Sequence, residues 1–349
     1  SVPGVIMQFT GKDNPMTYTY TGLLFSAIFC IAVFTTWMCT WEAKDVREEF
    51  EPEPEGANSG NLWHHLKSLV LDLLSSFKIK MFRQHIIIYI ASFTATDVFG
   101  SVFTYYVVYG LHQDAAAASG YLSVATFVSV LGTFVFMMLL SKLNFTPSGA
   151  LRLSYSCIFA VLAFLFYAYI NNINVSVVLF SAVFVVLGVS RAGLYFIPWN
   201  IYSFIPDVDE IVTKKRREGI FAGVMVLTRK STVALAIMLI GVVLEESGFV
   251  KGQGEQPIEA LHAIVGLMVF ATAALLSISF WMTFKFKLTR ESHKTLIKEV
   301  ARLKLGGDLA DCDMETRKVI KDLTGYEYDK VWGNTPGRKT PASLTPESP

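Results

Sequence analysis

The sequence predicts an all-α membrane protein with seven transmembrane helices. Two observations carry this prediction: a mean hydropathy of +0.45 and a charged fraction of only 17% over 349 residues. A soluble chain of this length would be about a quarter charged. Lipid penalises charge, and it requires that helices or closed barrels satisfy the backbone polar groups. Because the apolar runs are too long for barrel strands, we expect helices.

Seven apolar segments are each long enough to cross about 30 Å of hydrocarbon as a helix. They are Tyr18–Trp41, Ile86–Gly110, Tyr121–Ser141, Leu151–Ile170, Val175–Ile205, Gly219–Leu244 and Ala260–Phe284. Basic residues gather in every second connection and at the start of the tail, whereas the other connections are nearly free of them. By the positive-inside rule, this predicts an external N-terminus and a cytoplasmic C-terminus in the inner cell membrane.

The expected organisation follows from these spans. It comprises an external loop (1–17), a first span (18–41), a cytoplasmic connector (42–85), a six-helix bundle (86–284) and a cytoplasmic tail (285–349). In the connector, apolar residues at helical spacing from Leu62 to Phe77 predict an amphipathic helix on the membrane surface. The tail predicts a short amphipathic helix around Leu296–Leu303 and a proline-rich, disordered end.

Composition also narrows the classes of partner. The net charge of +1 gives no electrostatic footprint for nucleic acid. The four dispersed cysteines indicate neither a disulfide framework nor a metal site. We expect a monomer whose partners are the lipid bilayer and a small molecule.

Charge is concentrated in Pro206–Lys230, which reads PDVDEIVTKKRREGIFAGVMVLTRK. The simplest interpretation of its first half is a loop at the membrane surface. Lys230 lies about eleven residues inside the following helix, roughly 16 Å deep at 1.5 Å per residue. It shares a helical face with small residues that include Gly223 and Ala234, whereas Arg229 lies on the adjacent face. We expect the small-residue face to pack inside the bundle, with Lys230 pointing inward.

Asp97 and Arg191 are charged residues inside other spans. A charge at the bilayer centre costs at least about 2.5–3.5 kcal/mol, so each requires a partner, a water-filled cavity or a function. Asp97 belongs to a polar stripe that is either structural or part of a transport pathway. Arg191 shares a face with Tyr195 and lies close to Trp199. A donor fork beside aromatic rings suits a polyhydroxylated ligand. The alternative is an internal salt bridge, for which Asp97 is a candidate partner.

The stretch PDVDEIVTKKRREGIFAGVM, followed by Arg-Lys, resembles the glycoside–pentoside–hexuronide:cation symporters, the melibiose-carrier-like branch of the major facilitator superfamily. The matching residues are Asp207, Asp209, Glu210, Thr213 and Lys215 to Gly219, and Lys214 stands where the family usually has glycine. The resemblance covers about residues 1–300. It implies that the seven spans are helices six to twelve of a twelve-helix bundle. The start at Ser1 without a methionine agrees with a protein that is incomplete at its N-terminus.

The resemblance implies a secondary active transporter and not an enzyme. Such a protein moves a sugar, glycoside or uronide together with Na⁺ or H⁺ by alternating access. It implies no cofactor other than the coupling cation, whose carboxylate ligands belong to the family's N-terminal half. Lys230 occupies the motif position of the family's sugar-site lysine. The burial argument adds four further substrate-binding candidates: Asp97, Arg191, Tyr195 and Trp199.

The charged loop then acquires a mechanical interpretation as a cytoplasmic gate. We expect Arg216, Arg217 and Glu218 to form ion pairs with the acidic cluster or with the opposite half of the protein. The acidic cluster consists of Asp207, Asp209 and Glu210. Because exposed ion pairs are weak, only a network of them would favour one access state. A seven-helix receptor and a membrane scaffold without transport activity remain alternatives.

Overall fold

The computed structural model describes residues 16–40, 73–171, 173 and 176–333. Most of the predicted external loop, the first part of the connector with most of its amphipathic helix, and the end of the tail lie outside these residues. The chain falls into two units, Ser1–Ser68 and Leu69–Pro349, which are described separately.

In the first unit the structure describes one helix, α2 (Thr17–Cys39). This helix contains no charged residue, and at 1.5 Å per residue its 23 residues extend about 35 Å. Its large apolar side chains, such as Phe29 and Trp37, are exposed. An apolar surface of this length suits lipid, so α2 fits the first predicted span.

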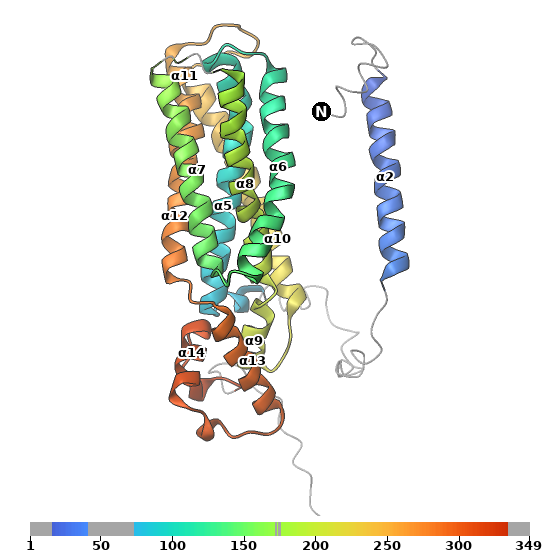
Figure 1. The fold of residues 1–349 in the computed structure, drawn as a ribbon, viewed down its shortest axis with the longest axis vertical. Coiled ribbons are helices and arrows are strands. Elements are labelled where there is room, and N and C mark those ends of the chain that lie inside the picture. Colours follow the sequence, from blue (N-terminus) through green and yellow to red (C-terminus); the bar gives the residue numbers. More distant parts are fainter. Residues whose placement is uncertain (1–15, 41–72, 172, 174–175, 334–349) are drawn as a thin grey trace, which may run out of the picture. The chain divides into compact units, whose positions relative to one another are not determined.

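The second unit contains the other six helices that are long and apolar enough to span a membrane (Figure 1). They are α5 (Lys80–Tyr105), α6 (Ala115–Ser141), α7 (Pro147–Ile170), α8 (Val177–Tyr202), α10 (Glu218–Glu246), and α11 (Ile258–Val265) continued by α12 (Thr272–Lys285). π-Helical segments extend α5 over Tyr106–Gly110 and join α11 to α12 over Gly266–Ala271. The described residues contain no strand, so the predicted all-α membrane fold is confirmed.

Several helices begin earlier than their apolar cores. The prediction began the second span at Ile86, but α5 begins at Lys80 and includes Arg83 and His85. A hydropathy pattern ends at the first charges, whereas a helix continues as long as its backbone hydrogen bonds form. The seven predicted spans are therefore correct in number and place. Most begin too late, whereas the first extends past Cys39, where α2 ends, and the fifth begins before Val177, where α8 begins.

Helix α5 is central and α10 is peripheral. In the most apolar window of each span, 67% of the residues of α5 are buried, against 6% for α10. The most extensive helix contact of the described bundle lies between α6 and α8. A Cβ atom added at Gly188 of α8 would lie 2.5 Å from the carbonyl oxygen of Ala125 in α6. Glycine at this position therefore lets the two backbones approach.

The predicted packing of the small-residue face of α10 is wrong for the described chain. Gly219, Gly223, Ala234 and Lys230 are all exposed. A small-residue stripe permits a close helix contact but does not supply the neighbour. No described helix of the second unit covers this face, so Lys230 points away from the six-helix bundle.

A short helix, α9 (Ile205–Thr213), follows α8 at the end of the bundle where the tail begins (Figure 1). The tail folds there as α13 (Arg290–Lys304) and α14 (Met314–Thr324). Thr289 begins α13 with a capping box that involves Ser292, and Asp313 caps the first turn of α14. The two tail helices and α9 bury one continuous apolar core, so α9 is not a loose surface loop. This core includes Val208, Ile211, Leu296, Val300, Leu303, Ile320 and Leu323.

Candidate functional site

An ion pair joins α5 to α10 near the middle of both helices. The Oδ2 atom of Asp97 lies 2.5 Å from Nη1 of Arg229, and Nη2 of Arg229 donates to Oδ1 at 2.9 Å. The side chains are 25% and 19% exposed, respectively. The alternative in which Asp97 pairs with Arg191 is therefore wrong. The pair gives each charge an opposite partner at a depth where an isolated charge is costly, and its hydrogen bond is the contact between Nη2 and Oδ1.

The sequence analysis chose Lys230, and not its neighbour Arg229, as the residue of α10 that points into the bundle. A helical wheel assigns each residue to a face but does not say which face meets another helix. Asp97 was a usable signal, because a carboxylate inside a span requires a cation at similar depth. Arg229 and Lys230 both satisfied that requirement on α10, and only the packing of α10 on α5 selects Arg229.

A row of four aromatic residues lies beside this ion pair, and we call it the aromatic strip: Tyr89 and Phe93 of α5, Tyr195 and Trp199 of α8. The ring centroids of Phe93 and Tyr195 are 5.0 Å apart, and those of Tyr89 and Trp199 are 5.9 Å apart, both edge to face. The Arg229 guanidinium lies 5.2 Å from the centre of the Phe93 ring. Tyr195 and Trp199 are 36% and 45% exposed, so the strip presents ring surface that a ligand can contact.

Arg191 extends along α8 toward the same strip. Its Nη2 atom donates to the Tyr195 hydroxyl at 3.4 Å, and its guanidinium lies 5.7 Å from the centre of the Tyr195 ring. Its Nε atom is buried and has no hydrogen-bond partner among the described residues. The predicted shared face of Arg191 and Tyr195 is therefore present, and the guanidinium keeps donor capacity.

The charges at this depth are unbalanced. Near the midpoints of the described spans, three cations accompany a single carboxylate. They are Arg191, Arg229 and Lys230 against Asp97. Lys230 forms no ion pair within the described residues and is exposed beside Arg229. This face therefore carries two cations beyond the Asp97–Arg229 pair.

Each of the three carboxylates in the acidic cluster of α9 forms an ion pair. Arg217 donates to both carboxylate oxygens of Asp209, at 2.7 and 2.6 Å, and to Oγ of Ser75 at 2.9 Å. The Asp209 side chain has no solvent exposure. Arg216 lies 3.4 Å from Asp207 and 2.6 Å from Glu218. The ion pairs expected between the charged loop and the acidic cluster are thus found for both arginines.

The other partners of the acidic cluster come from the tail. Nε2 of His293 lies 2.8 Å from Asp207, and Nζ of Lys304 lies 2.6 Å from Glu210. The backbone N–H groups of Trp332 and Gly333 donate to the carbonyl oxygens at the end of α9, at 2.7 and 3.1 Å. These contacts join residues more than 80 positions apart, so the sequence pattern gave no sign of them. The tail therefore holds α9 from two sides.

Lys214 ends α9 in the left-handed conformation, with φ = 58°. Glycine is the usual residue for that conformation because it lacks a Cβ. A glycine would adopt this conformation without strain. In this chain the Lys214 ammonium lies 5.5 Å from the centre of the Trp332 ring, a contact that supports the strained position.

A carboxylate inside the tail stabilises α13. Glu299 accepts hydrogen bonds from Arg302, at 2.7 and 3.0 Å, and from the Tyr328 hydroxyl. Burial alone would raise the pKa of Glu299, but these hydrogen bonds outweigh it and hold the pKa below its usual value. Burial and the contact with Glu299 raise the pKa of Tyr328. Glu299 is therefore ionised at neutral pH.

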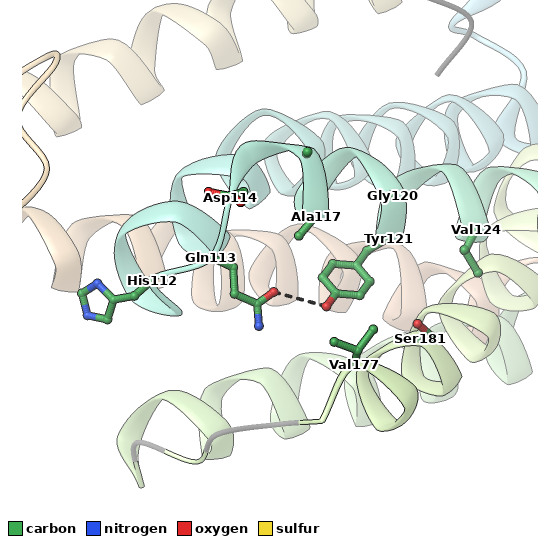
Figure 2. A pocket seen from close by; sticks show the side chains of 10 residues that line it. His112, Gln113, Asp114, Ala117, Gly120, Tyr121, Val124, Val177 and Ser181 are labelled. Atoms are coloured by element: carbon green, nitrogen blue, oxygen red, sulfur yellow. Dashed lines mark hydrogen bonds between the residues drawn. The ribbon is translucent and has the colours of Figure 1, made fainter. Parts of the chain in front are cut away.

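A cavity of about 690 Å³ lies at the opposite end of the bundle, between the N-terminal ends of α6 and α8 (Figure 2). Its lining includes His112, Gln113, Tyr121 and Ser181. The Tyr121 hydroxyl donates to Oε1 of Gln113 at 3.2 Å across the cavity wall. None of the predicted site residues lines it, so it is separate from the charges at membrane depth.

Comparison with known proteins agrees with this architecture. Residues 1–290 match the family described as MFS/sugar transport protein. The chain is also similar to an uncharacterized symporter from Synechocystis sp., with 37% identity over 124 residues. That match covers 34% of this chain and 22% of the relative, so it spans a minor part of the relative's length. Because the family match extends over most of the chain, the protein belongs to the MFS/sugar transport protein family, whose members are membrane transport proteins and not enzymes.

Proposed function

We propose that this chain is part of a secondary active transporter that carries a sugar, glycoside or uronide together with Na⁺ or H⁺. One observation carries the proposal: the Asp97–Arg229 pair and the aromatic strip lie together on one side of the bundle, close to an uncovered lysine. Family membership supports the transport of a sugar. It also argues against a seven-helix receptor.

Charge at membrane depth supports a solvated pathway on this side. Lys230 and part of the Asp97–Arg229 pair are accessible, whereas lipid would impose a cost of several kcal/mol on each exposed charge. Such residues face a water-filled cavity or another protein segment. A cavity against a second half-bundle gives them the polar surroundings that they require, and it is the arrangement that alternating access uses.

The chemistry of this face suits a polyhydroxylated ring. Trp199 and Tyr195 offer apolar faces on which a sugar ring stacks, and Lys230 and Arg191 supply donors for hydroxyl or carboxylate oxygens. Asp97, held by Arg229, keeps lone pairs that accept from hydroxyl groups. We assign Lys230, Arg191, Tyr195, Trp199 and Asp97 to the substrate site, with Arg229 as the residue that positions Asp97.

The acidic cluster of α9 and the adjoining arginines form the proposed gate. Alternating access requires contacts that exist in one state and break in the other. Buried acids held by Arg217, His293 and Lys304 give α9 one well-defined position. The proposal also includes several finer statements. We propose that the protein belongs to the melibiose-carrier-like branch, lies in the inner membrane with its tail in the cytoplasm, and is a monomer. We also propose that its spans are helices six to twelve and that the coupling cation binds outside this chain.

Uptake by the full-length protein tests the proposal. Cells that express it are assayed with a panel of radiolabelled monosaccharides, disaccharides and a hexuronate, with and without Na⁺ and with the proton gradient collapsed. We expect one solute to accumulate in a cation-dependent way. Accumulation of none of the panel would contradict a sugar transporter and favour a membrane scaffold.

Lys230→Ala tests the site in the same assay. We expect KM for the accumulated solute to rise about tenfold or more, because a charge-assisted hydrogen bond contributes about 1.5–3 kcal/mol. The matched control is Lys251→Ala, which removes an exposed lysine from the connection between α10 and α11. Equal KM values for the two variants would remove Lys230 from the site.

A further inference from the structure

A second cavity, of about 540 Å³, lies at the end of the bundle where the tail begins. Its walls come from the end of α6, the second half of α8 and the first turn of α13. We propose that this cavity binds an anionic phospholipid. It shares no residue with the substrate site, so this inference does not depend on the transported solute.

The inner wall of the cavity is apolar. Met137 and Leu140 come from α6, Phe196 from α8, and Phe145 from the connection that follows α6. Phe145 and Met137 are exposed in the absence of any covering group. A hydrocarbon chain in contact with these side chains would bury apolar surface that contributes roughly 25 cal/mol per Å².

The rim of the cavity is cationic. Arg290 and Lys294 begin α13 and line the cavity, and both are exposed. Neither forms an ion pair with a carboxylate of the described chain. Nη1 of Arg290 contacts only neutral acceptors, the Ser141 carbonyl and the Asn144 side chain, both at 3.4 Å. Two cations without anionic partners beside an apolar wall complement a phosphate attached to acyl chains.

The position of the cavity favours a lipid over a soluble anion. The spans α6 and α12 end at Ser141 and Lys285, and α7 begins at Pro147. Ser141 and Pro147 both line the cavity, so it lies at the boundary of the hydrocarbon layer, where headgroups reside. Basic pockets between helices at this level suit anionic headgroups.

Occupation of the cavity would act on α9 through His293. This side chain lines the cavity and also contacts Asp207 at 2.8 Å. Its ring lies 4.4 Å from the ring of Phe204, a further lining residue that comes immediately before α9. A bound headgroup would therefore lie against the contact through which α13 holds the acidic cluster.

Native mass spectrometry of the full-length protein tests the proposal directly. The protein is placed in nanodiscs of phosphatidylcholine with or without phosphatidylglycerol, released, and scored for retained phosphatidylglycerol. We expect one preferentially retained phosphatidylglycerol. Replacement of both rim cations (Arg290→Ala with Lys294→Ala) should reduce its retention about thirtyfold, since each cation contributes about 1 kcal/mol near an anionic surface and 1.4 kcal/mol corresponds to about tenfold.

Two controls separate a built site from general attraction to the membrane. Lys298→Ala with Lys318→Ala removes two exposed tail lysines that do not line the cavity and should leave retention unchanged. Ser141→Trp keeps the rim cations but fills the cavity, and it should abolish preferential retention. Equal losses in the two double variants, undiminished retention in Ser141→Trp, or full displacement of the lipid by inorganic phosphate would each overturn the proposal.

Discussion

Two regions of this protein hold charged side chains in apolar surroundings, the acidic cluster and the middle of the bundle. They differ in how many of these side chains have a partner of opposite charge. At the acidic cluster, each carboxylate has a cationic partner, and Asp209 is completely shielded from solvent. At the middle of the bundle, Asp97 has one partner, while Arg191 and Lys230 have no carboxylate partner among the described residues.

This difference separates structural charge from charge available to a ligand. A closed set of ion pairs fixes the position of α9 and leaves little binding capacity. An open set of donors at membrane depth keeps its hydrogen-bonding capacity for another group. On these grounds we expect substitutions at the acidic cluster to lower stability and, because this cluster is the proposed gate, to change uptake through the balance of access states. Substitutions near Arg229 should change uptake directly, through the substrate site.

The largest loss of stability should come from Asp209→Ala. Removal of this carboxylate leaves the Arg217 guanidinium, 10% exposed, without its bidentate partner, at a cost of about 3–5 kcal/mol. Thermal unfolding in detergent measures the change. The control is Glu218→Ala, whose carboxylate is 58% exposed and contributes at most about 1 kcal/mol. Asp209→Asn serves if the alanine variant does not accumulate, and a loss no greater than that of the control would contradict a structural role.

Arg229→Ala should abolish uptake and destabilise the protein by about 2–3 kcal/mol, because Asp97 is left without a cation at membrane depth. Adding Asp97→Ala should recover most of the stability but none of the uptake. Recovered stability without recovered uptake would distinguish this region most clearly from the acidic cluster. Recovery of uptake in the double variant would show that the pair has only a structural role.

His293→Ala with Lys304→Ala should loosen the tail from α9 by about 1–2 kcal/mol in total, because the Lys304 side chain is 54% exposed and its ion pair is weak. We expect faster cleavage between α12 and α14 by the protease Glu-C, which cuts after glutamates such as Glu291 and Glu299 that neither variant changes, measured by mass spectrometry of the fragments. The control pair, Lys298→Ala with Lys318→Ala, removes the same number of basic side chains from exposed tail positions. Equal cleavage rates for the two pairs would mean that these contacts do not hold the tail.

The smallest effect should be the acid dependence due to Glu299. Its pKa is lowered in the folded tail, so its contribution is complete above the unfolded pKa of about 4.3 and is lost as pH falls through the folded value. We expect Glu299→Gln to lose part of this acid dependence. The measurement is the difference in unfolding temperature between the two proteins at neutral pH and at about pH 3. A constant difference would contradict the lowered pKa.

The sequence predicts what depends on local composition. Apolar runs such as Leu151–Ile170 locate the spans, and the motif from Asp207 onward identifies the charged stretch together with the arginines that engage it. Asp209 and Arg217 are only eight residues apart, within reach of a short helix and its following turn.

Partner choice over long separations could not be predicted in the same way. Asp97 and Arg229 are 132 positions apart, and His293 and Asp207 are 86 apart. Each pairing depends on which helices are neighbours, and a hydropathy pattern does not contain that information. The lack of information about neighbouring helices also explains the wrong prediction for the small-residue face of α10. The sequence pattern shows that a face can pack closely, but it does not show that a neighbouring helix is present.

The attachment of α9 to the tail has a consequence for biosynthesis. Asp209 and Arg217 leave the ribosome together, but His293 follows Asp207 by 86 residues. At about 5–20 residues per second, that separation corresponds to roughly 4–17 s of elongation. During this interval Asp207 has Arg216 but not His293, and Glu210 lacks Lys304, its cation, which follows it by 94 residues (304 − 210). The acidic helix is therefore completed last, after the final span has been translated.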